Sequence, residues 1–361
     1  MTYCSVRTRG NASESVRSRY MVFHMLEWDH STAETVRCKY GGPAVPAGIM
    51  QKRPFIIDCD TGTDDTIAII AALGCEEMEI VGITSVNGNV PESYTSRNNI
   101  NLMEYLGYSI PVCHGAILPL LGSKTTGASA NIHGKTGLGS TELPEAEHSD
   151  FDPRIAAQFI YEEAVKRNGE LELLVTGPIT NIAICLCEHP DLPKYIKHLY
   201  FMGGSTVGGN VNTSAEYNIW VDAESRDIVL QSGIPIKFVP LDACYGVAEV
   251  NGEDRKKLLS FGTRCGDFIV NANSKLLQFN IDFYGKDIVS QPDPSRVACA
   301  LCDGVILEER TCNARCETKT ETGYGQLIYD FNSPQPHNCT VVTKISGEKF
   351  KEYLFETARQ E

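Results

Sequence analysis

Short apolar runs alternate along the chain with stretches whose apolar residues recur at helical spacing. The apolar runs predict strands over 54–59, 78–86, 110–115, 171–175, 198–204 and 234–241. The helical spacing predicts helices over 63–74, 92–106, 153–167 and 178–188. Strands that alternate with helices indicate a parallel sheet covered on both faces. The expected fold is therefore a single α/β domain, Rossmann-like, with an open, mostly parallel central sheet and a C-terminal extension of helices and strands.

Two segments lie outside this pattern. Residues 1–50 show no steady period and end in GGPAVPAG, so we interpret them as a poorly ordered N-terminal extension before a catalytic domain over 51–361. Residues 122–150 are rich in glycine and predict a long loop. The first helix, in contrast, has clear ends: Thr63 is the expected N-cap and Gly74 the expected stop.

Polar residues follow several of the predicted strands. They are Asp58 and Asp60, Asn87 and Asn89, Thr176, the loop 203–218, and Asp242. In open parallel sheets, ligands bind beyond the carboxyl ends of the strands. No GxGxxG pattern follows the first strand, so a dinucleotide site is not indicated. The sequence predicts a site for a small polar ligand.

Four aspartates occur within eight positions of the stretch IIDCDTGTDD, residues 56–65. An aspartic protease would need two Asp-Thr-Gly loops, and the chain has one. An Asp-x-Asp phosphohydrolase would use Asp58 as the nucleophile, although Gly62 stands where such enzymes carry threonine. A metal site accounts for all four residues, because Asp60 and Asp65 can converge on a hard cation such as calcium. Asp58 and Asp64 would then be outer acceptors or helix-capping acids.

Charge and cysteine content narrow the choice of partners. The formal net charge is −14, which argues against nucleic acid or an anionic membrane as the main partner. No apolar run reaches transmembrane length. Many of the 14 cysteines lie in apolar runs, which is typical of free thiols in a reducing compartment, and we expect a cytoplasmic protein. Four cysteines have a spacing that could suit zinc, but we interpret them as thiols because no suitable loop joins them: Cys299, Cys302, Cys312 and Cys316.

The run Asp58-Cys-Asp60-Thr-Gly62-Thr-Asp64-Asp65 resembles the N-terminal signature of the nucleoside hydrolases. These are calcium-dependent N-ribohydrolases related to the inosine–uridine-preferring enzymes. The resemblance covers roughly 53–357 and includes five further stretches: VNGN (86–89), NIHGKTGLG (131–139), VTGPITNIA (175–183), MGG…GN…AEYN (202–218) and QPDP (291–294). It implies hydrolysis of ribonucleosides to free base and ribose by a homodimer or homotetramer.

The resemblance also implies roles for single residues. The calcium ligands would be Asp60, Asp65, the Thr176 carbonyl and Asp293, and Asp60 would be the general base toward a calcium-bound water. A further set would bind the substrate: Asp64, Asn89, His133, Asn210, Glu216, Tyr217 and Asn218. The chemistry suits these residue types, because an oxocarbenium-like transition state needs a positioned water and a base, and a cis-diol offers oxygens to calcium.

One position departs from the family pattern. Many members carry a histidine directly before the last aspartate ligand, where it protonates the leaving base; here that residue is Pro292, which cannot donate a proton. Leaving-group activation must come from elsewhere, and the candidates by residue type are Tyr284, Tyr217, Trp220 and His133. Two alternatives to a nucleoside hydrolase stay open: a magnesium-dependent phosphohydrolase with an aspartate nucleophile, and a riboside-binding relative that turns over poorly.

Overall fold

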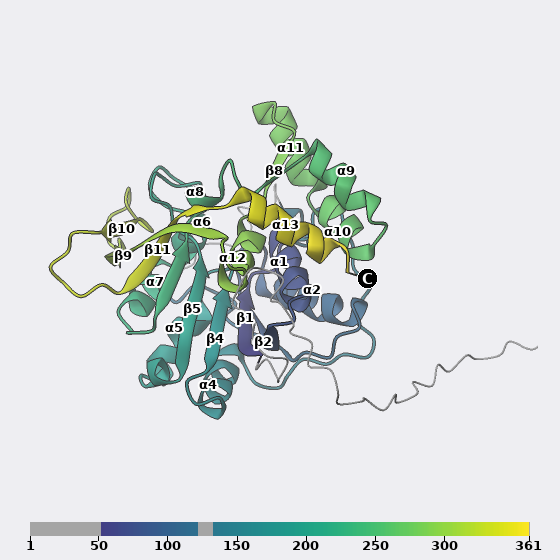
Figure 1. Cartoon of the computed structure of the whole chain (residues 1–361). Helices are drawn as coiled ribbons and strands as arrows, with labels where there is room; N and C mark the ends of the chain where they lie inside the picture. Colours follow the sequence, from purple (N-terminus) through teal and green to yellow (C-terminus); the bar gives the residue numbers. More distant parts are fainter. Residues whose placement is uncertain (1–51, 122–132, 361) are drawn as a thin grey trace, which may run out of the picture.

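A nine-stranded sheet forms the centre of the molecule (Figure 1). The computed structural model describes residues 52–121 and 133–360. The strand order is β10-β9-β11-β6-β5-β4-β1-β2-β3, and every pairing from β11 to β3 is parallel. The strands are β1 (Arg53–Cys59), β2 (Met78–Ser85), β3 (Val112–Cys113), β4 (Leu171–Val175), β5 (Ile196–Met202), β6 (Ile236–Val239), β9 (Ile306–Cys316), β10 (Leu327–Asp330) and β11 (Cys339–Ile345). The predicted fold class is confirmed.

Helices cover both faces of the sheet, and a hydrophobic cluster fills each interface. One cluster takes most of its helical residues from α1 (Thr63–Leu73), α2 (Glu92–Tyr105), α10 (Arg264–Ala272), α12 (Pro292–Leu301) and α13 (Gly347–Ala358). The other takes them from α4 (Ala156–Lys166), α5 (Thr180–Glu188), α6 (Tyr217–Val221) and α7 (Ala223–Leu230). Strands β1, β4 and β5 read as nearly continuous apolar runs because the sheet is buried on both faces.

The predicted elements are all present, with shifted ends. The third predicted strand, 110–115, is reduced to Val112–Cys113 at the edge of the sheet. The first helix starts one residue after the predicted cap: Gly62 is the N-cap, because its backbone is extended and its N–H donates to the Asp65 carboxylate at 2.9 Å. Thr63 is thus the first helical residue, and the predicted stop at Gly74 is confirmed.

The C-terminal extension is a three-stranded arm followed by a helix that packs back onto the domain. Strand β11 lies parallel to β6. Strand β9 then adds antiparallel to β11, and β10 adds antiparallel to β9 at one edge of the sheet (Figure 1). Helix α13 packs against α1, α10 and α12. A separate β7 (Glu249–Asn251) and β8 (Ile288–Ser290) form a two-stranded sheet, with α9 (Gly252–Ser260) and α11 (Ser274–Tyr284) beside it.

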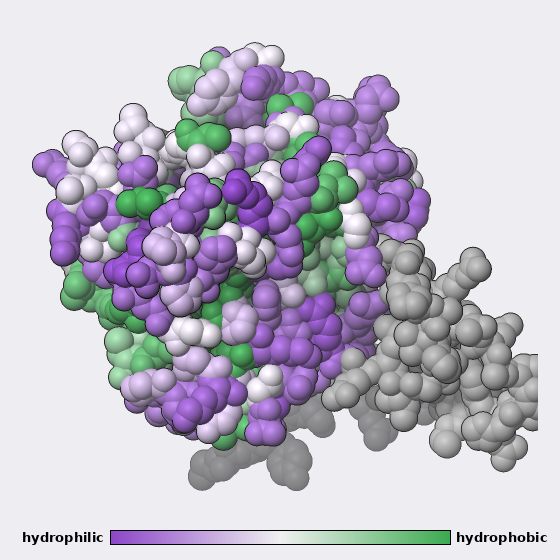
Figure 2. Space-filling view, turned by 60° about the vertical axis from the view of Figure 1, so that its left-hand side comes forward, coloured by the Kyte–Doolittle hydropathy of each residue, from purple (hydrophilic) through white to green (hydrophobic). Residues whose placement is uncertain are grey.

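The face of the molecule in Figure 2 is mostly hydrophilic, with apolar side chains in small separate patches. Among the described helices, none combines the length and the apolar character that a bilayer crossing needs. The predicted extension over 1–50 lies outside the described residues, and so do residues 122–132 of the predicted loop over 122–150.

Candidate functional site

The ends of three neighbouring strands bring the predicted polar residues together. Strand β1 lies between β2 and β4, with Asp58 in register with Thr84 on one side and Val175 on the other. The residues just past these strand ends, including Asp60, Asn89 and Thr176, therefore meet at the carboxyl edge of the sheet.

Asp60 is fully buried between two glycines. Its Oδ2 accepts a hydrogen bond from the Asn89 N–H at 2.7 Å, whereas its Oδ1 has no hydrogen-bond partner. A Cβ placed on Gly88 would lie 2.0 Å from Asp60 Oδ2, and one on Gly177 would lie 2.7 Å from Asp60 Oδ1. Burial and the neighbouring charge of Asp65 raise the pKa of Asp60 well above its ordinary value.

Asp65 is held by three donors from different parts of the chain. Its carboxylate accepts from the Gly62 N–H at 2.9 Å, the Asn89 amide at 3.2 Å and the Thr176 hydroxyl at 2.6 Å. Burial, followed by the charge of Asp64, raises the pKa of Asp65 to about 6. These hydrogen bonds therefore fix the Asp65 carboxylate close to the carboxylate of Asp64.

The carboxylate oxygens of Asp64, Asp65 and Asp293 lie within 4.8 Å of one another, a geometry that could hold a metal ion. Arg296 donates to Asp293 Oδ1 at 2.7 Å and fixes it from behind. One positive charge does not balance these acids, because burial and the charges of Asp64 and Asp65 still raise the pKa of Asp293. Mutually repelling buried carboxylates, with the unpartnered Asp60 Oδ1 beside them, suit a hard cation.

Asp64 contributes to this cluster more directly than the sequence predicted. We expected Asp64 in the substrate set and Asp60 among the metal ligands, yet the three acids that converge within 4.8 Å include Asp64 and not Asp60. The Thr176 carbonyl, a predicted ligand, accepts from the Asn218 amide at 2.7 Å. A carbonyl oxygen has a second lone pair, so that bond leaves room for a cation.

Asp58 lies away from this cluster and supports the strand ends. It is fully buried, and its Oδ1 accepts from the Thr84 hydroxyl at 2.5 Å and from the Asn181 amide at 2.7 Å. Burial raises the pKa of Asp58 to about 7. A phosphohydrolase nucleophile would have to face its substrate, and Asp58 does not line the large cavity described below.

The cavity beside the acidic cluster has a volume of about 910 Å³. Nine predicted site residues line it: Asp64, Asn89, His133, Thr176, Asn210, Glu216, Tyr217, Asn218 and Asp293. The other two, Asp60 and Asp65, are fully buried and hydrogen-bond to its wall through Asn89. The structure thus brings all the predicted site residues to one place.

Glu216 and Asn218 are held by the start of α6. Glu216 is the N-cap, and its two oxygens accept from the N–H groups of Asn218 and Gly204, each at 3.0 Å. Glu216 is buried, and burial raises its pKa. It is therefore not the solvated loop acid that a Gly-rich loop would suggest. Asn210 accepts from the Tyr217 N–H at 2.9 Å, so it also shapes the loop.

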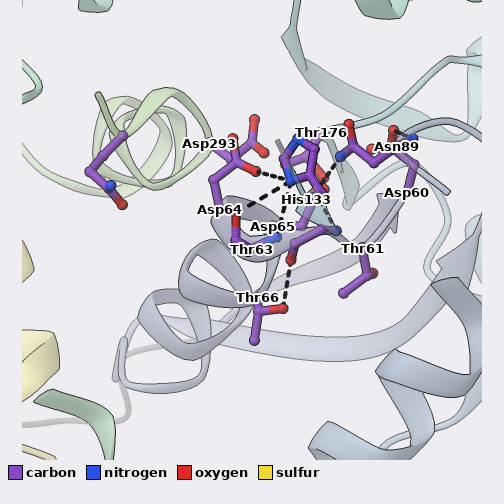
Figure 3. Close-up of polar contacts among 12 residues, drawn as sticks. Asp60, Thr61, Thr63, Asp64, Asp65, Thr66, Asn89, His133, Thr176 and Asp293 are labelled. Atoms are coloured by element: carbon purple, nitrogen blue, oxygen red, sulfur yellow. Dashed lines mark hydrogen bonds and ion pairs between the residues drawn. The ribbon is translucent and has the colours of Figure 1, made fainter. Parts of the chain in front are cut away.

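His133 lies over the acidic cluster. In Figure 3 its ring stands between Asp64 on one side and Asn89 and Asp60 on the other. Its Nδ1 lies 3.3 Å from the Thr63 hydroxyl and 4.0 Å from the Asp64 carboxylate. Burial lowers the pKa of His133. The predicted substrate residue His133 therefore lies beside the acidic cluster.

The candidate proton donors differ in whether they line the cavity and whether their polar group is already hydrogen-bonded. The Tyr217 hydroxyl donates to the Gly88 carbonyl at 2.7 Å and is already engaged. Trp220 is not among the described residues that line the cavity, whereas Tyr284 lines it together with Pro292. Tyr284 is 65% exposed, at the end of α11.

Sequence reasoning named Tyr284 but missed the residues beside it. Leu276 and Asn280 line the cavity from α11 together with Tyr284, and Lys286 follows them. The spacing of four residues places 276, 280 and 284 on one helix face, which was the available signal. It was not decisive, because apolar residues recur all along SKLLQFNIDFY and the spacing does not show which helix face meets a cavity.

The backbone at Gly88 gives a direct test of how tightly Asp60 is held. We expect Gly88→Ala to lower catalytic turnover by roughly 10²-fold, because the new methyl group would displace the Asp60 carboxylate, and small displacements are costly in a positioned site. Steady-state kinetics of the full chain measure this effect. Gly74→Ala is the matched control, because its φ of −80° suits any residue and the nearest atoms to a Cβ there belong to the end of the Gln360 side chain, away from the cavity. Equal losses in both variants would contradict the assignment.

The predicted cysteine set does not form a zinc site. Cys299 lies in α12 and Cys302 caps its end, whereas Cys312 and Cys316 lie in β9. The acidic cluster is the one group within residues 52–121 and 133–360 whose His, Cys, Asp or Glu atoms converge in this way. Cys312 is instead next to Cys339, with their sulfur atoms 3.6 Å apart.

Known proteins share both the sequence and the fold. The chain is 33% identical over 319 residues to a pyrimidine-specific ribonucleoside hydrolase, RihA, of Shewanella sp. (strain ANA-3), covering 84% of this chain and 96% of that one. It is 32% identical over 308 residues to a protein of the same name from Citrobacter koseri, covering 84% and 97%.

Among solved structures, a plant nucleoside hydrolase, PpNRh1, has a TM-score of 0.80 at 25% identity, covering 86% of this chain and 99% of that one. A purine-preferring ribonucleoside hydrolase from Gardnerella vaginalis has a TM-score of 0.79 at 29% identity, covering 85% and 98%. The model of the inosine–uridine preferring nucleoside hydrolases matches residues 55–352. The chain, with its acidic cluster at the carboxyl edge of a parallel sheet, therefore belongs to the inosine–uridine preferring nucleoside hydrolase family.

Proposed function

We propose that the protein hydrolyses the N-glycosidic bond of ribonucleosides to free base and ribose, with Asp60 as the general base. One observation carries this proposal: a single cavity is lined both by carboxylates and amides and by α11 with Tyr284. The first set suits the hydroxyl groups of a ribose, because carboxylates accept from hydroxyls and amides both donate and accept. The second set suits the flat face of a base.

A calcium ion fits the donor set at the sugar end. Asp64, Asp65 and Asp293, whose oxygens converge, would hold it together with Asp60 and the Thr176 carbonyl. When bound, the cation supplies positive charge that lowers the pKa of a water molecule and orients it together with the sugar diol. The residues of the chain do the rest: Arg296 holds Asp293, and Thr176 and the Gly62 N–H hold Asp65.

The contacts of Asp60 support its proposed role as the general base. Its Oδ2 is fixed by the Asn89 N–H, and its Oδ1 is left to accept a proton. In the proposed reaction a water molecule attacks the anomeric carbon as the bond to the base breaks, and Asp60 takes one proton from that water. Asn210, Glu216 and Asn218 would position the ribose, since all three line the cavity.

The preference for a purine or a pyrimidine nucleobase cannot be carried over from the relatives, because their preferences differ. Two of them are named pyrimidine-specific and another purine-preferring. Pro292, in the position of the usual histidine, also makes slow turnover of natural ribosides a second candidate behaviour. One assay panel separates the classes: base release from uridine, cytidine, inosine and adenosine, phosphate release from a monoester, and riboside binding measured by calorimetry. Phosphate release without base release would reject the proposal.

We expect tightly held calcium in the purified protein, and we expect its removal to lower the thermal midpoint. Removing the cation leaves buried carboxylates that repel one another, and any ligand that binds only the folded state stabilises it. A calcium concentration 100 times the Kd corresponds to about 2.7 kcal/mol. Elemental analysis gives the metal content, and thermal unfolding with and without chelator gives the shift.

Asp293→Asn is the matched variant for that experiment. It keeps the side-chain volume and removes one charge from the cluster, so its thermal midpoint should respond less to chelator than that of the wild type. Protein that contains no calcium, and whose unfolding is unchanged by chelator and by added calcium, would reject the metal assignment.

A further inference from the structure

Two thiols face each other in the C-terminal arm. Cys312 of β9 and Cys339 of β11 are direct partners in the antiparallel register, and their sulfur atoms are 3.6 Å apart. Direct antiparallel partners have Cα atoms about 4.5–5.5 Å apart. A disulfide bond requires a Cα separation of about 4.4–6.8 Å. The two strands therefore already hold these cysteines at a separation that a disulfide can bridge.

The surroundings of this pair contain no third ligand. Cys312 and Cys339 belong to the same hydrophobic cluster as Phe238 and Val341, and both are buried. Cys316 lies four residues along the same strand, about 13 Å away at the usual rise per residue. Within the described part of the chain, neither thiol belongs to a group that could hold a metal. Two adjacent thiols without a third ligand can form a disulfide but lack the donors of a metal site.

The pair is close to the surface of the arm. Cys339 is the first residue of β11, and most of residues 331–338 before it are exposed. Only two residue pairs, Thr340 with Lys237 and Val341 with Phe238, join β11 to β6. Strand ends open more readily than strand centres, so a small reagent can reach this pair without global unfolding. The hydrogen bond with Cys339 also lowers the pKa of Cys312, which favours the reactive thiolate.

We propose that Cys312 and Cys339 form a redox modification site, in which a low-molecular-weight disulfide such as oxidised glutathione converts the two thiols into an intramolecular disulfide. One cysteine thiolate attacks the reagent, forms a mixed disulfide and expels one glutathione thiolate. The second cysteine thiolate then attacks the sulfur of the first cysteine and expels the other glutathione. The two protons lost by the cysteines are taken up by the two glutathione thiolates, and the electrons balance.

The bond would fasten the arm that supports part of the cavity wall. Leu327 and Tyr329 of β10 pack against Gly204, whose N–H donates to Glu216. The cysteines are 27 positions apart in the chain, so the bond would restrict the unfolded chain and raise the thermal midpoint by about 5 °C. Neither cysteine lines the cavity, so the oxidised and reduced forms should have the same turnover.

The test uses the native full chain equilibrated without oxygen in reduced or oxidised glutathione, quenched with acid and alkylated. Peptide mass spectrometry should find Cys312 joined to Cys339 only in the oxidised sample, with two hydrogens fewer. Thermal unfolding of the same samples should show the raised midpoint. Cys312→Ala should abolish both the link and the shift, whereas the matched variant Cys316→Ala, on the same face of β9, should keep both.

Exposed Cys187 reports whether the reagent has reacted, because it should carry glutathione in the oxidised sample. Modified Cys187 without the Cys312–Cys339 link would overturn the proposal. So would a link that forms only in urea, or a link between Cys312 and Cys316. None of these outcomes depends on the proposed hydrolase activity, because every readout concerns the peptides and the unfolding transition.

Discussion

Asp60→Asn is expected to lower kcat on every ribonucleoside that the wild type accepts by roughly 10³-fold, within the range for general base catalysis. Asparagine has nearly the same shape, but its amide cannot take a proton from water. The change also removes one negative charge from the cluster and so weakens calcium binding. Steady-state kinetics at saturating calcium isolate the loss of the base from the loss of the metal.

The matched variant is Asp58→Asn, two residues earlier in the same buried strand end. Asp58 accepts hydrogen bonds from Thr84 and Asn181, and burial rather than a neighbouring carboxylate raises its pKa, so it lies apart from the acidic cluster and its replacement should reduce kcat far less than that of Asp60. If Asp60→Asn and the wild type have equal kcat on a ribonucleoside, Asp60 is not the base. If Asp58→Asn causes the larger loss, the roles of the two aspartates are reversed.

Nitrophenyl riboside is expected to turn over roughly 10²–10⁴-fold faster than uridine or inosine. Its leaving group, nitrophenolate, departs without a proton, and Pro292 has no proton to supply. The natural bases must be protonated or stacked as they leave. Pyrimidine ribosides should be slowest unless another donor acts. Parallel measurements of kcat on the three substrates give the ratio directly.

Two of the candidate donors remain, since His133 and Tyr284 both line the cavity. Burial lowers the pKa of His133 and so favours its neutral form, which leaves Tyr284, 65% exposed beside Pro292, as the donor that we expect to act. Tyr284→Phe should therefore depress turnover of natural nucleosides by roughly 10²-fold and spare nitrophenyl riboside. Phe283→Leu is the control, because Phe283 is adjacent and exposed but does not line the cavity. Comparable wild-type turnover of uridine and nitrophenyl riboside would refute this account of the missing acid.

Local sequence determined the order of the elements and the place of the site. Apolar runs of strand length and helical spacing are short-range signals, so the alternation of strands and helices was readable for 53–241. The aspartates of 58–65 are likewise local, and a parallel sheet places such residues at its carboxyl edge. The family resemblance added Asp293, which no periodicity connects with Asp60, and it assigned roles to single residues of the loop 203–218.

Only the tertiary structure decided which groups contact one another across long separations. Thr176 donates to Asp65 over a separation of 111 residues, and Cys312 meets Cys339 because β11 enters the sheet between β6 and β9. The choice of Gly62 as the helix cap depended on where the Asp65 carboxylate points. Tyr284 faces the cavity and Trp220 does not, although both are aromatic and both were candidates. Residue type states what a side chain can do, whereas packing of distant elements determines what it faces.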